Sequence, residues 1–106
     1  MKVISNQLRR SAQGQECTLN IPGACLYSPD TVVLCHFPDE FNGMGTKASD
    51  VSAGFGCDGC HAVLDGRANH TSLSREDREF YMRRSMLRTW SVWIDLGLIR
   101  IAGAKP

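Results

Sequence analysis

The segment Cys57-Asp58-Gly59-Cys60-His61 decides how this chain folds. Its two cysteines are two residues apart, and the glycine eases a tight turn, so both sulfurs can reach one metal ion at about 2.3 Å. Two further cysteines, Cys17 and Cys25, flank a stretch that contains Pro22 and Gly23 and can fold back on itself. A tight pair and a wide pair together complete a tetrahedral four-thiolate site. The sequence therefore predicts a structural zinc ion bound by Cys17, Cys25, Cys57 and Cys60.

Other interpretations of the cysteines stay open. Cys35 or His61 could replace one of the four ligands. The cysteines could also be buried apolar residues or a redox pair, although a redox Cys-x-x-Cys normally begins a helix in a thioredoxin-like context, which this sequence lacks. The odd count of 5 cysteines fits four ligands and one left over.

Composition indicates one ordinary globular domain over residues 1–106, with 42% hydrophobic and 22% charged residues. The formal net charge is +1, so any contact with nucleic acid must come from a local basic patch. No apolar run has the length of a signal peptide or a membrane span. We therefore expect a cytoplasmic protein without membrane contact, where metal ligation is more common than disulfide bonding.

The expected fold class is α+β. Residues 1–16 are polar and are expected to form an irregular arm, and residues 17–66 a zinc-stapled finger. Within the finger we expect strands over 31–37 and near 51–55, then a short helix beginning at 61 and ending before Gly66. A further short strand is expected at 98–102.

The strongest helical signal covers residues 74–96. Ser74 is a good N-cap and Gly97 a good stop, and acidic residues fill the first turn. Phe80, Leu87 and Ile94 recur at helical spacing, with Met82, Met86, Trp90 and Trp93 beside them. This pattern predicts a long amphipathic helix with a broad apolar face, of which an exposed part could support a homo-oligomer. The tryptophans could stack on bases but are better explained as core residues.

Two histidines suggest chemistry. His36 follows the first strand, and His61 follows Cys60 directly, with Asp65 one helical turn further on. His61 and Asp65 could bind a divalent ion while His36 activates water, which is the arrangement for phosphodiester hydrolysis. A lone histidine is more often a surface or core residue, so this pattern by itself is weak.

The order of these motifs resembles the HNH, or ββα-metal, nuclease signature. The chain as a whole, over roughly residues 7 to 100, resembles the small YbcO-type proteins of phages and prophages, which are described as nucleases. The residues that carry the resemblance are Leu8-Arg9, Gly14-Gln15-Glu16-Cys17, Ile21-Pro22-Gly23, Leu34-Cys35-His36-Phe37-Pro38, Asn42-Gly43-Met44-Gly45, Cys57-x-x-Cys60-His61 and Asp65-Gly66-Arg67.

The resemblance implies a role for each matching residue. His36 corresponds to the general base, His61 and Asp65 to ligands of a catalytic magnesium or manganese ion, and the four cysteines to the zinc that pins the finger. It implies a DNA endonuclease in a bacterial or phage-infected cell, with phage DNA processing as a setting.

Two positions depart from the HNH pattern. Cys35 stands where a hard or imidazole ligand is usual, and a thiolate suits soft metals better than magnesium. Cys35 is therefore either a packed strand residue or a ligand of a transition metal such as zinc or manganese. The central asparagine is also missing, and Ser52 stands in its place with Asp50 close by, either of which could support the base.

The predicted contacts with nucleic acid are basic. The set comprises Lys47, Arg67, Arg83, Arg84 and Arg88, aided by Arg9 and Arg10, with His70 as a spare ligand or phosphate contact. The arginines could equally form a solvated helix face. An alternative function is a non-catalytic zinc-binding module that holds nucleic acid or a phage protein, and a third is a purely structural protein.

Overall fold

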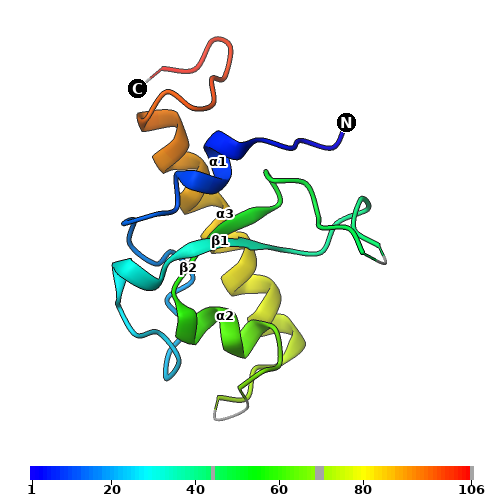
Figure 1. Cartoon of the computed structure of the whole chain (residues 1–106), viewed down its shortest axis with the longest axis vertical. Helices are drawn as coiled ribbons and strands as arrows, with labels where there is room; N and C mark the ends of the chain where they lie inside the picture. Colours follow the sequence, from blue (N-terminus) through cyan, green and yellow to red (C-terminus); the bar gives the residue numbers. More distant parts are fainter. Residues whose placement is uncertain (44, 69–70, 106) are drawn as a thin grey trace.

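The computed structural model describes residues 1–43, 45–68 and 71–105. In chain order the elements are α1 (Asn6–Arg10), a 3-10 helix η1 (Pro29–Thr31), β1 (Val33–His36), β2 (Ala53–Gly56), α2 (Asp58–Leu64) and α3 (Arg75–Asp95) (Figure 1). The small α+β fold predicted from the sequence is confirmed. In this part of the chain, no helix is both long and apolar enough to cross a membrane.

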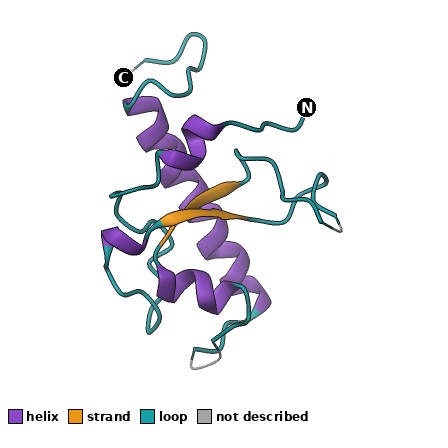
Figure 2. Cartoon of the chain, viewed as in Figure 1, coloured by secondary structure: helices purple, strands orange, loops and turns teal. Residues whose placement is uncertain are grey.

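The two strands form an antiparallel pair, in which Val33 lies opposite Gly56 and His36 opposite Ala53. The long helix α3 passes behind this pair and packs on β2, while α1 packs against β1 and α2 against β2 (Figure 1). Long loops join α1 to η1, β1 to β2 and α2 to α3, whereas single residues separate η1 from β1 and β2 from α2 (Figure 2). The sheet is therefore a small central platform that has α3 on one face.

Helix α3 begins and ends where the sequence predicts. The Ser74 side chain accepts a hydrogen bond from the Asp77 amide at 3.0 Å, and Gly97 adopts a φ of +74° just beyond the helix end. Such a conformation costs a glycine little.

The face that α3 buries differs from the prediction. Ser85, Thr89 and Trp93 are fully buried, whereas Phe80, Leu87 and Ile94 remain 48%, 54% and 42% exposed. The reason lies on β2, where a Cβ atom at Gly54 would stand only 2.1 Å from the Ser85 hydroxyl oxygen. The helix approaches the strand so closely that only small side chains fit between them.

Two further predictions were wrong. Residues 6–10 form α1 rather than an irregular arm, because Ser5 caps the helix and the Leu8 side chain of the helix is buried in the core. Residues 98–102 form no strand, because the amides of Leu98 and Ile99 bond to the Trp93 carbonyl oxygen at 2.8 and 3.4 Å and close the end of α3.

Trp93 of α3 contacts both β2 and the end of α1. Its ring meets Phe55 of β2 edge to face, with centroids 6.1 Å apart, and its indole nitrogen donates to the Ser11 hydroxyl at 2.7 Å. A buried tryptophan needs such a partner for its N–H. The expectation that Trp93 belongs to the core is confirmed.

Candidate functional site

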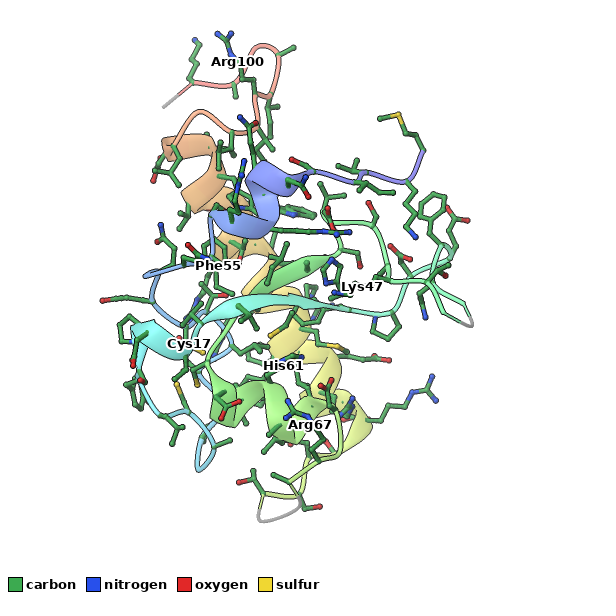
Figure 3. The ribbon with its side chains drawn as sticks, viewed as in Figure 1. Cys17, Lys47, Phe55, His61, Arg67 and Arg100 are labelled. Carbon is green, nitrogen blue, oxygen red and sulfur yellow. The ribbon has the colours of Figure 1, made fainter. Side chains whose placement is uncertain are left out.

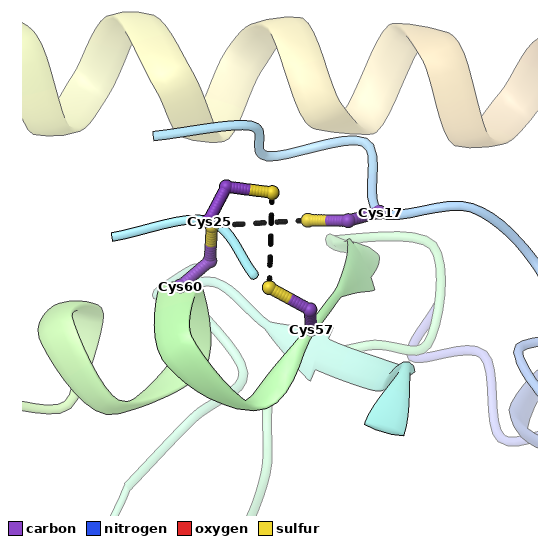
Figure 4. A group of neighbouring side chains, drawn as sticks. All are labelled: Cys17, Cys25, Cys57 and Cys60. Carbon is purple, nitrogen blue, oxygen red and sulfur yellow. Dashed lines mark hydrogen bonds between the residues drawn. The ribbon is translucent and has the colours of Figure 1, made fainter. Parts of the chain in front are cut away.

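The four predicted cysteines come together in space. Their sulfurs all lie within 4.8 Å of one another, and the Cys17–Cys60 and Cys25–Cys57 pairs are both 3.8 Å apart (Figure 4). Four sulfurs placed tetrahedrally at about 2.3 Å from a zinc ion would be about 3.8 Å apart, and all five cysteine thiols of the chain are free. The residues present therefore fit a four-thiolate zinc ion.

Local structure explains why these cysteines meet. Cys57 caps the N-terminus of α2 and Cys60 lies in its first turn, while Cys17 and Cys25 lie in the loop between α1 and η1. At Gly59, a Cβ atom would stand 2.1 Å from the Ala24 carbonyl oxygen, so only glycine lets the loop reach the helix. The amides of Ile21 and Leu26 point at the sulfurs of Cys60 and Cys57 at 3.4 Å, which favours thiolates.

The thiols of the cluster differ in acidity. Contact with Cys60 lowers the pKa of Cys17 and, together with burial, the same contact raises the pKa of Cys60. Burial also raises the pKa of Cys25. Since zinc binds thiolates, loading the site must release protons.

Cys35 lies outside this cluster. Its thiol points to the carbonyl oxygens of Val33 and Gly56 at 3.8 and 4.0 Å, and the residue is 2% exposed. Burial, followed by the charge of Asp65, raises the pKa of Cys35 to about 12. Because its thiol lies among strand carbonyl groups and outside the cysteine cluster, the structure favours the packed strand residue over the metal ligand.

His36 ends β1 and faces a buried carboxylate. Its Nε2 lies 2.7 Å from Oδ1 of Asp50, which is fully buried. Burial acts to raise the pKa of Asp50, but hydrogen bonds from His36, Ser5 and Arg9 outweigh it and hold that pKa below its ordinary value. Asp50 is therefore an ionised partner for the imidazole.

Ser52 has a different role. Its hydroxyl donates to the Phe37 carbonyl oxygen at 3.0 Å, and its own carbonyl accepts from the Phe37 amide at 2.8 Å. These bonds extend the pairing of the strands beyond His36. Of the two candidates for the missing asparagine, Asp50 is the one that contacts His36.

His61 lies on α2 and Asp65 one turn further on, at the C-cap of this helix, as their spacing predicts, with His61 Nε2 3.1 Å from Asp65 Oδ2. The Arg67 Nε is 3.4 Å from the same oxygen. In Figure 3, His61 and Arg67 lie at α2, whereas Lys47 lies closer to the strands. Within residues 1–43, 45–68 and 71–105, only the four cysteines form a cluster of three or more metal-ligating side chains.

Comparison with known proteins identifies the family. A family model described as "Putative nuclease YbcO" matches residues 6–98. The chain belongs to the YbcO family. "Putative nuclease YbcO" of Escherichia coli (strain K12) and "Putative nuclease ybcO" of Enterobacteria phage 82 are each 35% identical to it over 94 residues, covering 88% of this chain and 96% of theirs. A solved structure of a "putative bacteriophage protein" from E. coli K-12 matches with a TM-score of 0.68 and 30% identity, over 86% of this chain and 100% of that one.

The arginines of this YbcO-family chain divide into two groups. Arg84 donates to the carbonyl oxygens of Leu19 and Asn20 at 2.8 and 3.4 Å, and Arg88 donates to the Asn20 side chain at 3.0 Å. These two predicted phosphate contacts therefore hold the loop that carries Cys17 and Cys25. The other predicted contacts Lys47, Arg67 and Arg83 are exposed, and His70 lies outside the described residues.

The sequence missed one pair of contacts at the site. Arg9 and the Ser5 amide both bind Asp50, across more than forty residues of chain. The sequence suggested Arg9 as a contact with nucleic acid, but nothing in the sequence indicated that its partner is Asp50.

Proposed function

We propose that this YbcO-family protein is a metal-dependent DNA endonuclease of the HNH type, with His36 as the general base. The contact between His36 and Asp50 supports this role most strongly. Because the Asp50 carboxylate is ionised, it accepts a hydrogen bond from Nε2–H, and neutral His36 then keeps its lone pair on Nδ1. That nitrogen is then able to take a proton from the attacking water.

The surroundings of His36 suit one phosphate group. His36 lines a surface hollow of about 190 Å³ together with Phe37, Pro38 and the exposed Lys47. This volume is below the ~300 Å³ of a typical small-molecule pocket. The hollow is open at the protein surface, however, so a DNA strand lying across that surface can place one phosphate in it. A larger hollow of about 320 Å³ includes Glu16, whose charge would repel phosphate. We therefore place the scissile phosphate beside His36 and Lys47.

His61 and Asp65 are the residues that would hold the catalytic ion. They offer an imidazole nitrogen and a carboxylate oxygen, which suit manganese and, less well, magnesium. Such an ion would stabilise the negative charge that develops on the phosphate and leaving oxygen. Arg67 beside Asp65 adds a positive charge for the DNA backbone.

The zinc ion has a separate, structural role in this proposal. It ties α2 to the Cys17–Cys25 loop, and α2 also packs against β2, the partner of the strand that ends at His36. His61 on α2 thereby keeps a fixed position relative to His36. The descriptions of the two relatives from E. coli and phage 82 agree with a nuclease.

Nicking of supercoiled plasmid tests the proposal. Wild-type protein, loaded with zinc, is assayed with added magnesium or manganese beside His36→Gln, His36→Ala and His61→Ala. Glutamine retains a donor toward Asp50 but has no basic nitrogen, so it separates base catalysis from packing. A general base contributes about 10²- to 10⁴-fold, and both His36 variants should lose rate in that range. Variants that cut as fast as wild type would place any nuclease activity elsewhere.

One observation favours the alternative of a non-catalytic zinc-binding module. Among the described residues the cysteine cluster is the only group of three or more metal ligands, and its chemistry is structural. Such a module would bind nucleic acid or a phage protein without cutting. Binding of DNA by wild type, without nicking under any divalent metal, would support it.

A further inference from the structure

The N-terminal segment is bonded to the chain around Asp50. The Val3 amide donates to the Ser49 hydroxyl at 3.0 Å, and the Val3 carbonyl oxygen accepts from the Asp50 amide at 2.8 Å. The Ser5 amide donates to Asp50 Oδ2 at 2.7 Å. Residues that precede α1 therefore build one wall around this carboxylate.

Arg9 completes that wall with a charge. Its Nε lies 3.0 Å from both carboxylate oxygens of Asp50. Asp50 is fully buried, and a buried carboxylate without a compensating charge is strongly destabilised or takes up a proton. Asp50 can face His36 as an anion because Arg9 neutralises it from the other side.

We propose that Arg9 is a positioning residue for His36, acting through Asp50, and that the N-terminal segment is therefore part of the catalytic apparatus. Arg9 fixes the ionised state and the orientation of Asp50, and Asp50 fixes the tautomer and ring orientation of His36. This inference rests on the proposed role of His36 as base. It replaces the sequence-based interpretation of Arg9 as a phosphate contact, because the guanidinium Nε is directed at Asp50.

The test compares Arg9→Ala, Arg9→Lys and the control Arg100→Ala, which removes the same charge from an exposed position beyond α3. Steady-state nicking is measured for each zinc-loaded protein. Removing a residue that only orients a functional side chain typically lowers activity about 10- to 100-fold. We expect kcat to fall by this factor for Arg9→Ala, with little change in KM. Arg9→Lys should recover much of it, and Arg100→Ala should keep the wild-type kcat.

Nitrogen NMR of the His36 ring gives a readout that needs no activity. Wild type and Arg100→Ala should show His36 protonated on Nε2, and Arg9→Ala should show a mixture of tautomers or a protonated ring. If wild type does not cut DNA but this NMR difference is present, the nuclease proposal fails and the positioning by Arg9 stands. An unchanged His36 ring in Arg9→Ala overturns the inference, and so does a loss confined to KM or equal losses in the Arg9 and Arg100 alanine variants. Should Arg9→Ala not fold, the same comparison is made with Arg9→Gln, which keeps a hydrogen-bond donor but removes the charge; a mixed or protonated His36 ring is expected, and a wild-type ring would overturn the inference.

Discussion

Replacing Gly59 with alanine sets two physical effects against each other. Alanine is a better helix former than glycine by about 0.8–1.0 kcal/mol, so helix propensity alone predicts a more stable α2. In this structure, however, the new Cβ would lie 2.1 Å from the Ala24 carbonyl oxygen and 2.9 Å from a side-chain carbon of Leu26. The first of these separations is more than 1 Å short of ordinary contact, and its neighbour is backbone that cannot rotate away.

The clash should decide the outcome. Overpacking of this kind costs about 1–3 kcal/mol, which exceeds the gain in helix propensity. The strain exists only while the Cys25 loop is closed on α2, so it should be released when zinc leaves. If all of it is released, zinc affinity falls by roughly 5- to 150-fold, since about 1.4 kcal/mol corresponds to tenfold.

Zinc affinity is measured by competition with a chromophoric chelator, beside a thermal melt of the zinc-loaded protein. Asp58→Ala is the matched control, because it changes the preceding, exposed residue of α2 and leaves its backbone bond to Thr31 intact. We expect weaker zinc binding and a lower melting temperature for Gly59→Ala alone. Unchanged zinc affinity with a higher melting temperature would show that the loop does not approach α2 as closely as described.

Three other perturbations have definite expected results. A strong chelator should unfold the domain, followed by circular dichroism, because structural zinc contributes about 10–16 kcal/mol and a domain has a net stability of only about 5–15 kcal/mol. The pKa of Asp50 is lowered in the folded state, so its contribution to stability should be present above about pH 4 and lost as the pH falls through the folded pKa. The difference in unfolding free energy between wild type and Asp50→Asn should therefore shrink over the same pH range. Both proteins lose zinc in acid, so that loss cancels in the comparison. The Thr89 hydroxyl accepts a hydrogen bond from the Phe55 amide at 3.0 Å, and Thr89→Val leaves that amide unpaired. The free energy of unfolding, measured with denaturant, should therefore fall by about 1–3 kcal/mol for Thr89→Val and by less for Thr89→Ser.

Local sequence signals predicted the elements that depend on local chemistry. Ser74 and Gly97 marked the ends of α3, and the β-branched run before His36 marked β1. The Cys57-x-x-Cys60 turn identified half of the metal cluster and composition supplied the other half. Each of these depends on residues near one another in the chain or on one strongly specific residue type.

The errors have a common physical origin in contacts between distant segments. The buried face of α3 is set by Gly54 on β2, which admits Ser85, while Leu87 on the same helix stays in solvent. The partner of His36 is held by Arg9, whose helix was expected to be an irregular arm. Neither contact leaves a periodic or spacing signal, so the sequence could not indicate it.

X-ray absorption at the zinc edge tests the zinc-clamped fold most directly. On protein that contains one zinc per chain, it should show four sulfur neighbours at about 2.3 Å and no nitrogen or oxygen neighbour, as expected if Cys17, Cys25, Cys57 and Cys60 are the ligands. A first shell of three sulfurs and one nitrogen would contradict this set and implicate His61. Absence of stoichiometric zinc from protein that remains fully folded would contradict the metal clamp itself.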